Sequence, residues 1–184
     1  MIKRIHIIGA SGSGTSTLGR ALAENLGYKH FDTDDYFWLS KPPLFTQKRE
    51  RTDRQELLRM DLDKYESWIL TGTLCGWGDI FIPYFDLVVY LWVPKDIRIK
   101  RLIERERQRY GSDIEPGGSR YESYQNFIEW ASKYDEAGLD MRSRALHEYW
   151  MSTLTCPTLR IEGDFTVEER IEAVLKKVTQ NNFR

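Results

Sequence analysis

The sequence predicts an α/β fold, a three-layer α/β/α sandwich around a five-stranded parallel sheet. Three observations support this prediction. Short apolar segments alternate with segments of helical periodicity, which is the order typical of βαβ units. The apolar segments are nearly continuous, as expected for strands covered on both faces. A glycine-rich loop joins the first apolar segment to the first helical one, at an edge where parallel sheets bind ligands.

The predicted strands share an apolar run bounded by charged or turn-forming residues. They cover residues 4–8, 28–31, 68–71, 86–93 and 158–161. The first is apolar almost throughout, so we expect it at the centre of the sheet. The fourth is the longest apolar run, and Pro94 ends it because proline cannot donate to a central ladder.

Helical periodicity predicts the helices that cover this sheet. The first follows the glycine loop and ends at Gly27, which suits a left-handed cap. A second begins at Thr52 with a capping-box pattern. A charged helix covers residues 95–110, one or two helices lie within 121–154, and a capping box opens the last helix at 166–169.

Composition favours a single domain for the 184 residues, with a lid-like insertion at about 111–134 and an irregular loop over 39–52. The net charge of −1 argues against long-range attraction to nucleic acid or membrane. Cys75 and Cys156 are too few for a disulfide framework. With no apolar run of membrane-spanning length, we expect a cytoplasmic protein, whose oligomeric state the sequence leaves open.

The glycine loop nearly matches the phosphate-binding pattern G-x-x-x-x-G-K-[ST]. Gly9, Gly14 and Ser16 fit, and Thr15 stands where the pattern has lysine. Backbone N–H groups at a helix N-terminus favour an anion, and Ser16 is placed to give its hydroxyl to Mg²⁺. The predicted residues of this cofactor site are Gly9, Ser11, Gly12, Ser13, Gly14, Thr15, Ser16 and Thr17.

Three carboxylates, Asp32, Asp34 and Asp35, follow the second predicted strand. Asp32 is predicted to hold Mg²⁺ through water, and Asp34 to orient or deprotonate a substrate hydroxyl. The alternative is a polar turn with a helix cap. The aromatic residues Tyr36 and Trp38 suit stacking on a substrate, and equally suit hydrophobic packing.

A second glycine segment, beginning at Gly72 and Thr73, follows the third predicted strand. Glycine there lets the backbone approach a substrate closely, although a winding loop has the same composition. Asp35, Tyr36, Trp38, Gly72 and Thr73 form the predicted acceptor site.

The charged helix over 95–110 is one candidate source of the positive charge that Thr15 lacks. Its arginines at positions 98, 101, 105 and 109 fall on one face. Arg101, Arg105 and the more distant Arg120 are predicted to stabilise charge on a transferring phosphoryl group. The alternative is a solvated helix whose arginines form salt bridges with its own glutamates. His6 and His30 are expected within strands and His147 on a helix surface, without metal roles.

The order of these motifs resembles the small-molecule kinases of the P-loop superfamily, the adenylate kinase and shikimate kinase group. The run 31–34 is similar to the D-x-D of shikimate kinases, whose first Asp supports Mg²⁺ and whose second binds the acceptor. The strand and arginine helix over 86–105 are similar to those leading into the lid of nucleoside monophosphate kinases. The chain also looks like bacterial adenylate-kinase-like proteins with threonine in place of the Walker A lysine.

This resemblance implies a P-loop NTPase fold with a helical lid, and ATP and Mg²⁺ as cofactors. The leading hypothesis is a kinase acting on a nucleoside monophosphate or a hydroxyl metabolite, with Asp34, Arg101, Arg105 and Arg120 as catalytic residues. One alternative is a regulatory protein that binds nucleotide without turnover, because Thr15 replaces the lysine. Another is a loop that binds only a phosphorylated metabolite or sulfate. The acceptor and the choice between ATP and GTP remain open.

Overall fold

The sheet contains five parallel strands in the order β2-β3-β1-β4-β5. The computed structural model describes residues 1–42 and 45–180. Its strands are β1 (Arg4–Gly9), β2 (Lys29–Asp32), β3 (Trp68–Thr71), β4 (Leu87–Trp92) and β5 (Thr158–Glu162). Each lies within one residue of its prediction at either end. The central position of β1, between β3 and β4, confirms the prediction from its continuous apolar run.

The helices alternate with the strands as predicted. They are α1 (Thr15–Leu26), α2 (Thr33–Phe37), α3 (Arg51–Leu62), α4 (Lys95–Tyr110), α5 (Tyr121–Ser132), α6 (Arg144–Met151) and α7 (Val167–Gln180). Two 3-10 segments, η1 (Asp79–Tyr84) and η2 (Gly111–Ile114), complete the described elements.

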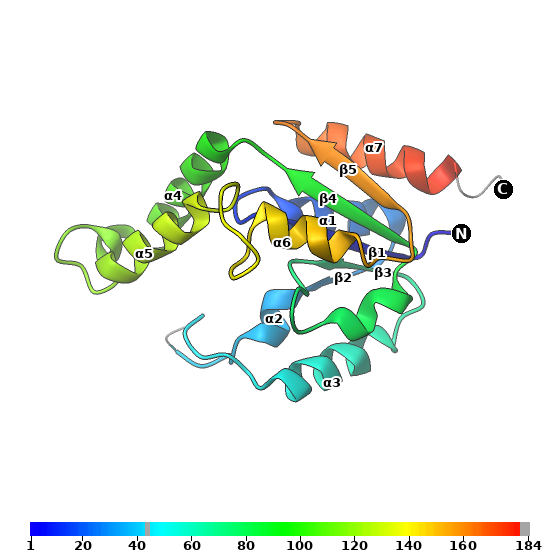
Figure 1. Ribbon diagram of the computed structural model, residues 1–184, viewed down its shortest axis with the longest axis horizontal. Helices are drawn as coiled ribbons and strands as arrows, with labels where there is room; N and C mark the ends of the chain where they lie inside the picture. Colours follow the sequence, from blue (N-terminus) through cyan, green and yellow to red (C-terminus); the bar gives the residue numbers. More distant parts are fainter. Residues whose placement is uncertain (43–44, 181–184) are drawn as a thin grey trace.

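One face of the sheet is covered by α1 and α7 (Figure 1). Ile5 and Ile7 of β1 point to this face and pack with Leu18 and Leu22 of α1 and with Val174 of α7. All five side chains are fully buried. This packing fixes the start of α1, and with it the glycine loop, against the carboxyl end of β1.

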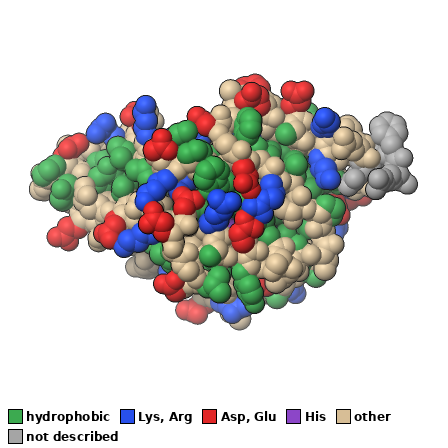
Figure 2. Space-filling model, turned by 45° about the horizontal axis from the view of Figure 1, so that its top comes forward, with side chains coloured by type: hydrophobic (Ala, Val, Ile, Leu, Met, Phe, Trp, Pro, Cys, Tyr) green, Lys and Arg blue, Asp and Glu red, His purple; other side chains and the backbone are tan. Residues whose placement is uncertain are grey.

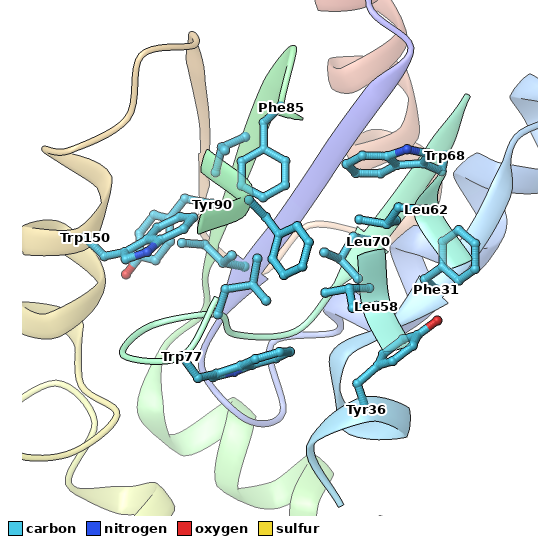
Figure 3. Close-up of a cluster of buried hydrophobic side chains, with 14 residues drawn as sticks. Phe31, Tyr36, Leu58, Leu62, Trp68, Leu70, Trp77, Phe85, Tyr90 and Trp150 are labelled. Carbon is cyan, nitrogen blue, oxygen red and sulfur yellow. The ribbon is translucent and has the colours of Figure 1, made fainter. Parts of the chain in front are cut away.

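The opposite face carries an aromatic cluster beneath α3, η1 and α6. Figure 3 shows Trp68, Phe85 and Trp150 from three different segments closing over this side of the sheet. His6 of β1 lies in the same layer and stacks on Phe85 at 4.9 Å between ring centroids. Both layers are therefore apolar cores. The central strands β1, β3 and β4 are covered on both sides, whereas the edge strands β2 and β5 are partly exposed, so the predicted burial on both faces is wrong for these two.

The segment from α4 to α5 extends beyond the carboxyl ends of the strands (Figure 1). Its base is held by Arg98, whose side chain is fully buried. This guanidinium donates to Asp135 Oδ2 at 2.6 Å and to the carbonyl oxygen of Val93 at 3.0 Å. The prediction of four equivalent arginines on one helix face is therefore wrong for Arg98. This residue anchors the fold instead of facing a ligand.

Three local predictions can be compared with the structure. Gly27 adopts the left-handed conformation expected of a cap. Thr166 and Glu169 form the predicted reciprocal capping box, at 2.8 and 3.2 Å. The box predicted at Thr52 is wrong, because α3 begins at Arg51 and the side chain of Gln55 donates to the carbonyl of Trp77 at 2.5 Å.

The predicted loop 39–52 gives way to α3 at Arg51. Its Lys48 forms an isolated antiparallel bridge with Trp38, which precedes the loop, and positions 43 and 44 lie outside the described residues. Over the described ranges, no helix is both long and apolar enough to cross a membrane. Basic and acidic side chains intermix over the face drawn in Figure 2.

Candidate active site

The glycine loop runs from the end of β1 into α1, and its backbone is shaped by two glycines with positive φ. Gly12 has φ +81° and Gly14 has φ +90°. A Cβ on Gly12 would lie 2.7 Å from the carbonyl oxygen of Arg98, so α4 packs directly on the loop. Both the dihedral angle and the close approach exclude larger residues at position 12.

The start of α1 is open to an anion. Gly14 is its N-cap and offers no side chain to the first-turn N–H groups. The N–H groups of Thr15, Ser16 and Thr17 belong to this first turn, where a helix provides no internal acceptor. Together with the helix dipole, they form the kind of site that binds phosphate.

Ser13 differs from its neighbours in the loop. Its side chain is fully buried, and its N–H donates to the carbonyl of Ala10 at 3.1 Å. This N–H is therefore used inside the loop. Gly9, Ser11, Gly12 and Gly14 complete the turn around it.

The end of β2 meets the start of α1 at Asp32. Ser16 Oγ donates to Asp32 Oδ2 at 2.6 Å, and Thr71 Oγ1 donates to the same oxygen at 3.0 Å. Asp32 Oδ1 accepts from the N–H of Asp34 at 3.1 Å, capping α2. Asp32 is thus both the predicted helix cap and the partner of the loop serine.

This arrangement fits Mg²⁺ in its chemistry. A hydroxyl and a carboxylate are hard oxygen ligands, and Mg²⁺ in kinases typically keeps only one or two protein ligands beside phosphate and water. Ser16 and Asp32 supply that pair at adjoining positions. A cluster of three or more His, Cys, Asp or Glu ligands is absent from the described ranges 1–42 and 45–180.

Asp34 and Asp35 lie in the first turn of α2, open to solvent on one side. Desolvation by nearby protein atoms, together with the Asp32 charge, raises the pKa of Asp34 above its ordinary value. Arg142 partly offsets this shift. The same two causes raise the pKa of Asp35. This shift is in the direction that general-base catalysis favours.

The two aromatic residues predicted to line the acceptor site behave differently. Tyr36 is buried beside Leu58 in the aromatic cluster (Figure 3), and its hydroxyl donates to Asp61 at 2.9 Å. Its ring packs in the core, which was the alternative interpretation. Trp38 is half-buried next to Phe37, and its indole hydrogen bonds to Asp34.

Arg142 is a site residue that sequence reasoning missed. It lies in the loop between α5 and α6, with its guanidinium 5.7 Å from the Trp130 ring centroid. Its charge interacts with those of Asp34 and Asp32. Desolvation lowers the pKa of Arg142. Arg142 has no periodic pattern around it in the sequence, so only the fold brings it beside the acidic cluster.

The second glycine segment places Thr73 at the end of a buried hydrogen-bonded chain. Tyr90 and Tyr134 hydroxyls lie 3.0 Å apart, and Tyr134 Oη lies 2.8 Å from His147 Nδ1. His147 Nε2 lies 3.4 Å from Thr73 Oγ1. Burial, with the charge of Arg142, lowers the pKa of His147 to about 3, so the ring is neutral. The surface position predicted for His147 is wrong, because α6 packs this face on the sheet.

One direction of donation satisfies the buried groups in this chain. Tyr90 finds its acceptor in Tyr134, which donates to His147 Nδ1, and the neutral ring then carries its proton on Nε2 and donates to Thr73 Oγ1. The N–H of Cys75 also donates to Thr73 Oγ1, at 3.4 Å. The Thr73 hydroxyl also hydrogen bonds to the Cys75 side chain, and it lies beside Gly72, whose φ is +103°.

The predicted catalytic arginines are engaged with protein groups. Arg101 pairs with Asp164 at 2.7 Å and Arg105 with Glu106 at 2.8 Å. Arg120 lies over the Tyr110 ring, 4.1 Å from its centroid. All are in or beside the α4 to α5 segment, whose base contacts the glycine loop through Gly12.

Comparison with known proteins places this geometry in a family. The AAA-domain family model matches residues 5–124. An uncharacterized protein of Bacillus subtilis, YqaC, is 56% identical over 181 residues, covering 98% of this chain and 100% of the relative. The cytidylate kinase of Natronomonas pharaonis is 34% identical, covering 72% of this chain and 78% of the relative.

A solved structure supports the fold assignment. Shikimate kinase from Acinetobacter baumannii, in complex with shikimate, has a TM-score of 0.60 at 20% identity, covering 100% of this chain and 97% of that one. The same family is indicated by the five-stranded parallel sheet, the glycine loop and these relatives. The chain belongs to the AAA-domain family and, within the P-loop proteins, to the small-molecule kinases of the adenylate kinase and shikimate kinase group.

Proposed function

We propose that this protein is an ATP- and Mg²⁺-dependent kinase that phosphorylates a small acceptor, either a nucleoside monophosphate or a hydroxyl metabolite. The observation that carries the proposal is the 2.6 Å contact between Ser16 Oγ and Asp32 Oδ2. It joins the open start of α1 to the acidic end of β2, so a phosphate site and a carboxylate site adjoin. The two acceptor classes reflect relatives named cytidylate kinase and shikimate kinase.

The nucleotide phosphates would lie on the loop from Gly9 to Thr17, held by the N–H groups that open α1. Ser16 and Asp32 would hold Mg²⁺. When bound, the metal would neutralise charge on the phosphates. Neither residue needs to move far, since both already share one hydrogen bond.

The acceptor would lie between Asp34, Arg142 and Thr73, with Asp35, Trp38 and Gly72 beside it. For a hydroxyl metabolite, Asp34 would take the hydroxyl proton as the acceptor oxygen bonds to the γ-phosphorus. A nucleoside monophosphate would attack through an anionic phosphate oxygen, with no hydroxyl proton to remove. The bond from the γ-phosphorus to the leaving diphosphate breaks in the same transfer, releasing ADP. The charge of Arg142 favours an acceptor that carries an anionic group near its reacting oxygen.

Arg101, Arg105 and Arg120 would stabilise charge on the transferring phosphoryl group after the lid-like segment 111–134 closes. In that step they would exchange their present partners for phosphate oxygens. Surface ion pairs cost little to exchange, typically about 1 kcal/mol or less each. We expect Arg101→Ala or Arg105→Ala to abolish turnover, and Thr15→Lys to leave activity intact or raise it. Unchanged turnover in both arginine variants would refute this compensation.

Thr15 supports a second candidate, a regulatory protein that binds nucleotide without transfer, because the loop keeps its N–H donors but lacks lysine. Calorimetry with ATP and GTP, with and without Mg²⁺, followed by an acceptor screen for ADP release, distinguishes the two. Binding without turnover on any acceptor favours the regulatory role. A third outcome is that no nucleotide binds even at about millimolar concentration, where weak nucleotide binding would still be detected. This outcome favours a loop that binds phosphorylated metabolites or sulfate. In each case we expect a cytoplasmic protein with a small-molecule ligand.

A further inference from the structure

A buried arginine from the last helix lies behind the phosphate loop. Arg170 of α7 is only 3% exposed, and its Nη1 donates to the carbonyl oxygen of Ser13 at 2.7 Å. A Cβ on Gly14 would lie 3.1 Å from the same nitrogen. The guanidinium is therefore in contact with the backbone that would surround a phosphate.

Most of this guanidinium is unsatisfied within the protein. Nε and Nη2 are buried without a hydrogen-bond partner among the described residues, and no carboxylate there forms an ion pair with it. A buried charge without a partner is strongly unfavourable, so native proteins pair such groups or give them a ligand.

Arg98 shows how this chain treats a buried arginine with a structural role. Its side chain is fully buried, and it is neutralised by Asp135 at 2.6 Å and hydrogen bonded to two carbonyls. Arg170 has one carbonyl and no such carboxylate in the described part of the chain. Asp164 and Glu169 attract its charge without a direct ion pair. The contrast with Arg98 indicates that the missing direct partner of Arg170 is a ligand anion.

We propose that Arg170 is the resident cation of the phosphate loop, acting across one layer of backbone in place of the lysine that Thr15 replaces. This inference rests on the proposed use of the loop for phosphate. Arg170 holds the Ser13 carbonyl away from the bound anion, so the loop N–H groups face that anion. The core packing of α7 holds the guanidinium in place. Its charge therefore acts on bound nucleotide before phosphoryl transfer, without closure of the lid-like segment. Arg170 is a positioning and electrostatic residue, distinct from the lid arginines.

The test measures Mg²⁺-ATP affinity by calorimetry in five variants. Arg170→Met removes the charge, and we expect about 10- to 50-fold weaker binding for a charge acting across a peptide layer. Arg170→Lys keeps the charge and should lose only a few-fold. Val178→Ala, two turns along the buried face of α7, controls for loosened helix packing and should bind ATP as the wild type does.

Two variants that carry Thr15→Lys separate the charge of Arg170 from its packing. Thr15→Lys in the Arg170→Met background should restore most of the lost affinity, and should improve affinity less in the wild-type background. A packing role for Arg170 would give no such rescue. Wild-type affinity in Arg170→Met, or equal gains from Thr15→Lys in both backgrounds, would overturn the inference.

These outcomes differ from failure of the proposed kinase function. Binding without turnover removes the kinase but leaves the Arg170 effect measurable. If wild-type protein binds no nucleotide, the same variants are titrated with pyrophosphate. Pyrophosphate binding that Arg170→Met weakens supports the inference, and absence of pyrophosphate binding refutes it together with the phosphate site.

Discussion

Gly19 marks the closest approach of α1 to the sheet, and replacing it tests how the phosphate loop is positioned. A Cβ there would overlap Cγ2 of Thr71 and lie 2.9 Å from His30 Nε2. Thr71 in turn donates to Asp32 at 3.0 Å. Gly19→Ala should therefore push α1 away from β3 and disturb the Ser16 and Asp32 pair.

The magnitude follows from two opposing effects. Overpacking a closed core costs about 1 to 3 kcal/mol. Alanine in place of glycine inside a helix returns about 0.5 to 1 kcal/mol. We expect a net loss of about 1 to 2 kcal/mol in the free energy of unfolding, which for a chain of this size lowers Tm by about 2 to 8 °C.

Urea unfolding gives the stability of Gly19→Ala, and calorimetry gives its Mg²⁺-ATP affinity, which should also fall. Thr71→Ser removes Cγ2 while keeping the hydroxyl, so the double variant should recover part of both losses relative to Thr71→Ser alone. Stability of Gly19→Ala equal to or above the wild type would refute the close-packing explanation.

Three further outcomes are expected. Asp32→Asn removes the charge that accepts from Ser16, so affinity for Mg²⁺-ATP should fall about tenfold or more, with metal-free ATP little affected, by calorimetry. Arg98→Met leaves the half-buried Asp135 with only its Trp92 donor and should lower the free energy of unfolding by about 1 to 3 kcal/mol in urea; an unchanged free energy of unfolding contradicts the anchor role. Burial lowers the pKa of His6 and His147 to about 3, below the unfolded value of 6.5. The unfolded chain therefore binds more protons below about pH 6.5, and stability should fall by about 2 kcal/mol per histidine from pH 7 to 5. Equal unfolding free energies at the two pH values would contradict this.

The strands, the glycine loop and two helix caps could be predicted because each depends on neighbouring residues. The continuous apolar run of β1 is enough to require burial on both faces. Gly27 and the pair Thr166 and Glu169 satisfy backbone groups within one helical turn. Asp32 was also accessible to sequence reasoning, because a carboxylate after a parallel strand falls at the ligand-binding edge.

The errors occurred where a distant segment competes with a local signal. Gln55 fits a capping box, yet its amide donates to the Trp77 carbonyl because the loop between β3 and η1 lies against α3. His147 has the local pattern of a surface residue and is buried because α6 covers the sheet. In both cases burial and a long-range hydrogen bond outweigh a local preference.

The sequence by itself determined the parallel α/β architecture, the phosphate loop and its missing lysine, since local periodicity and spacing encode them. Tertiary structure alone decided which charges meet that loop. Arg170 contacts Ser13 across 157 positions, and Arg142 reaches Asp34 from the far side of the lid-like segment. Arg98 became an anchor because Asp135 folds against it. Spacing along a helix sets the direction of a side chain, but packing decides whether its charge has a partner or is left for a ligand.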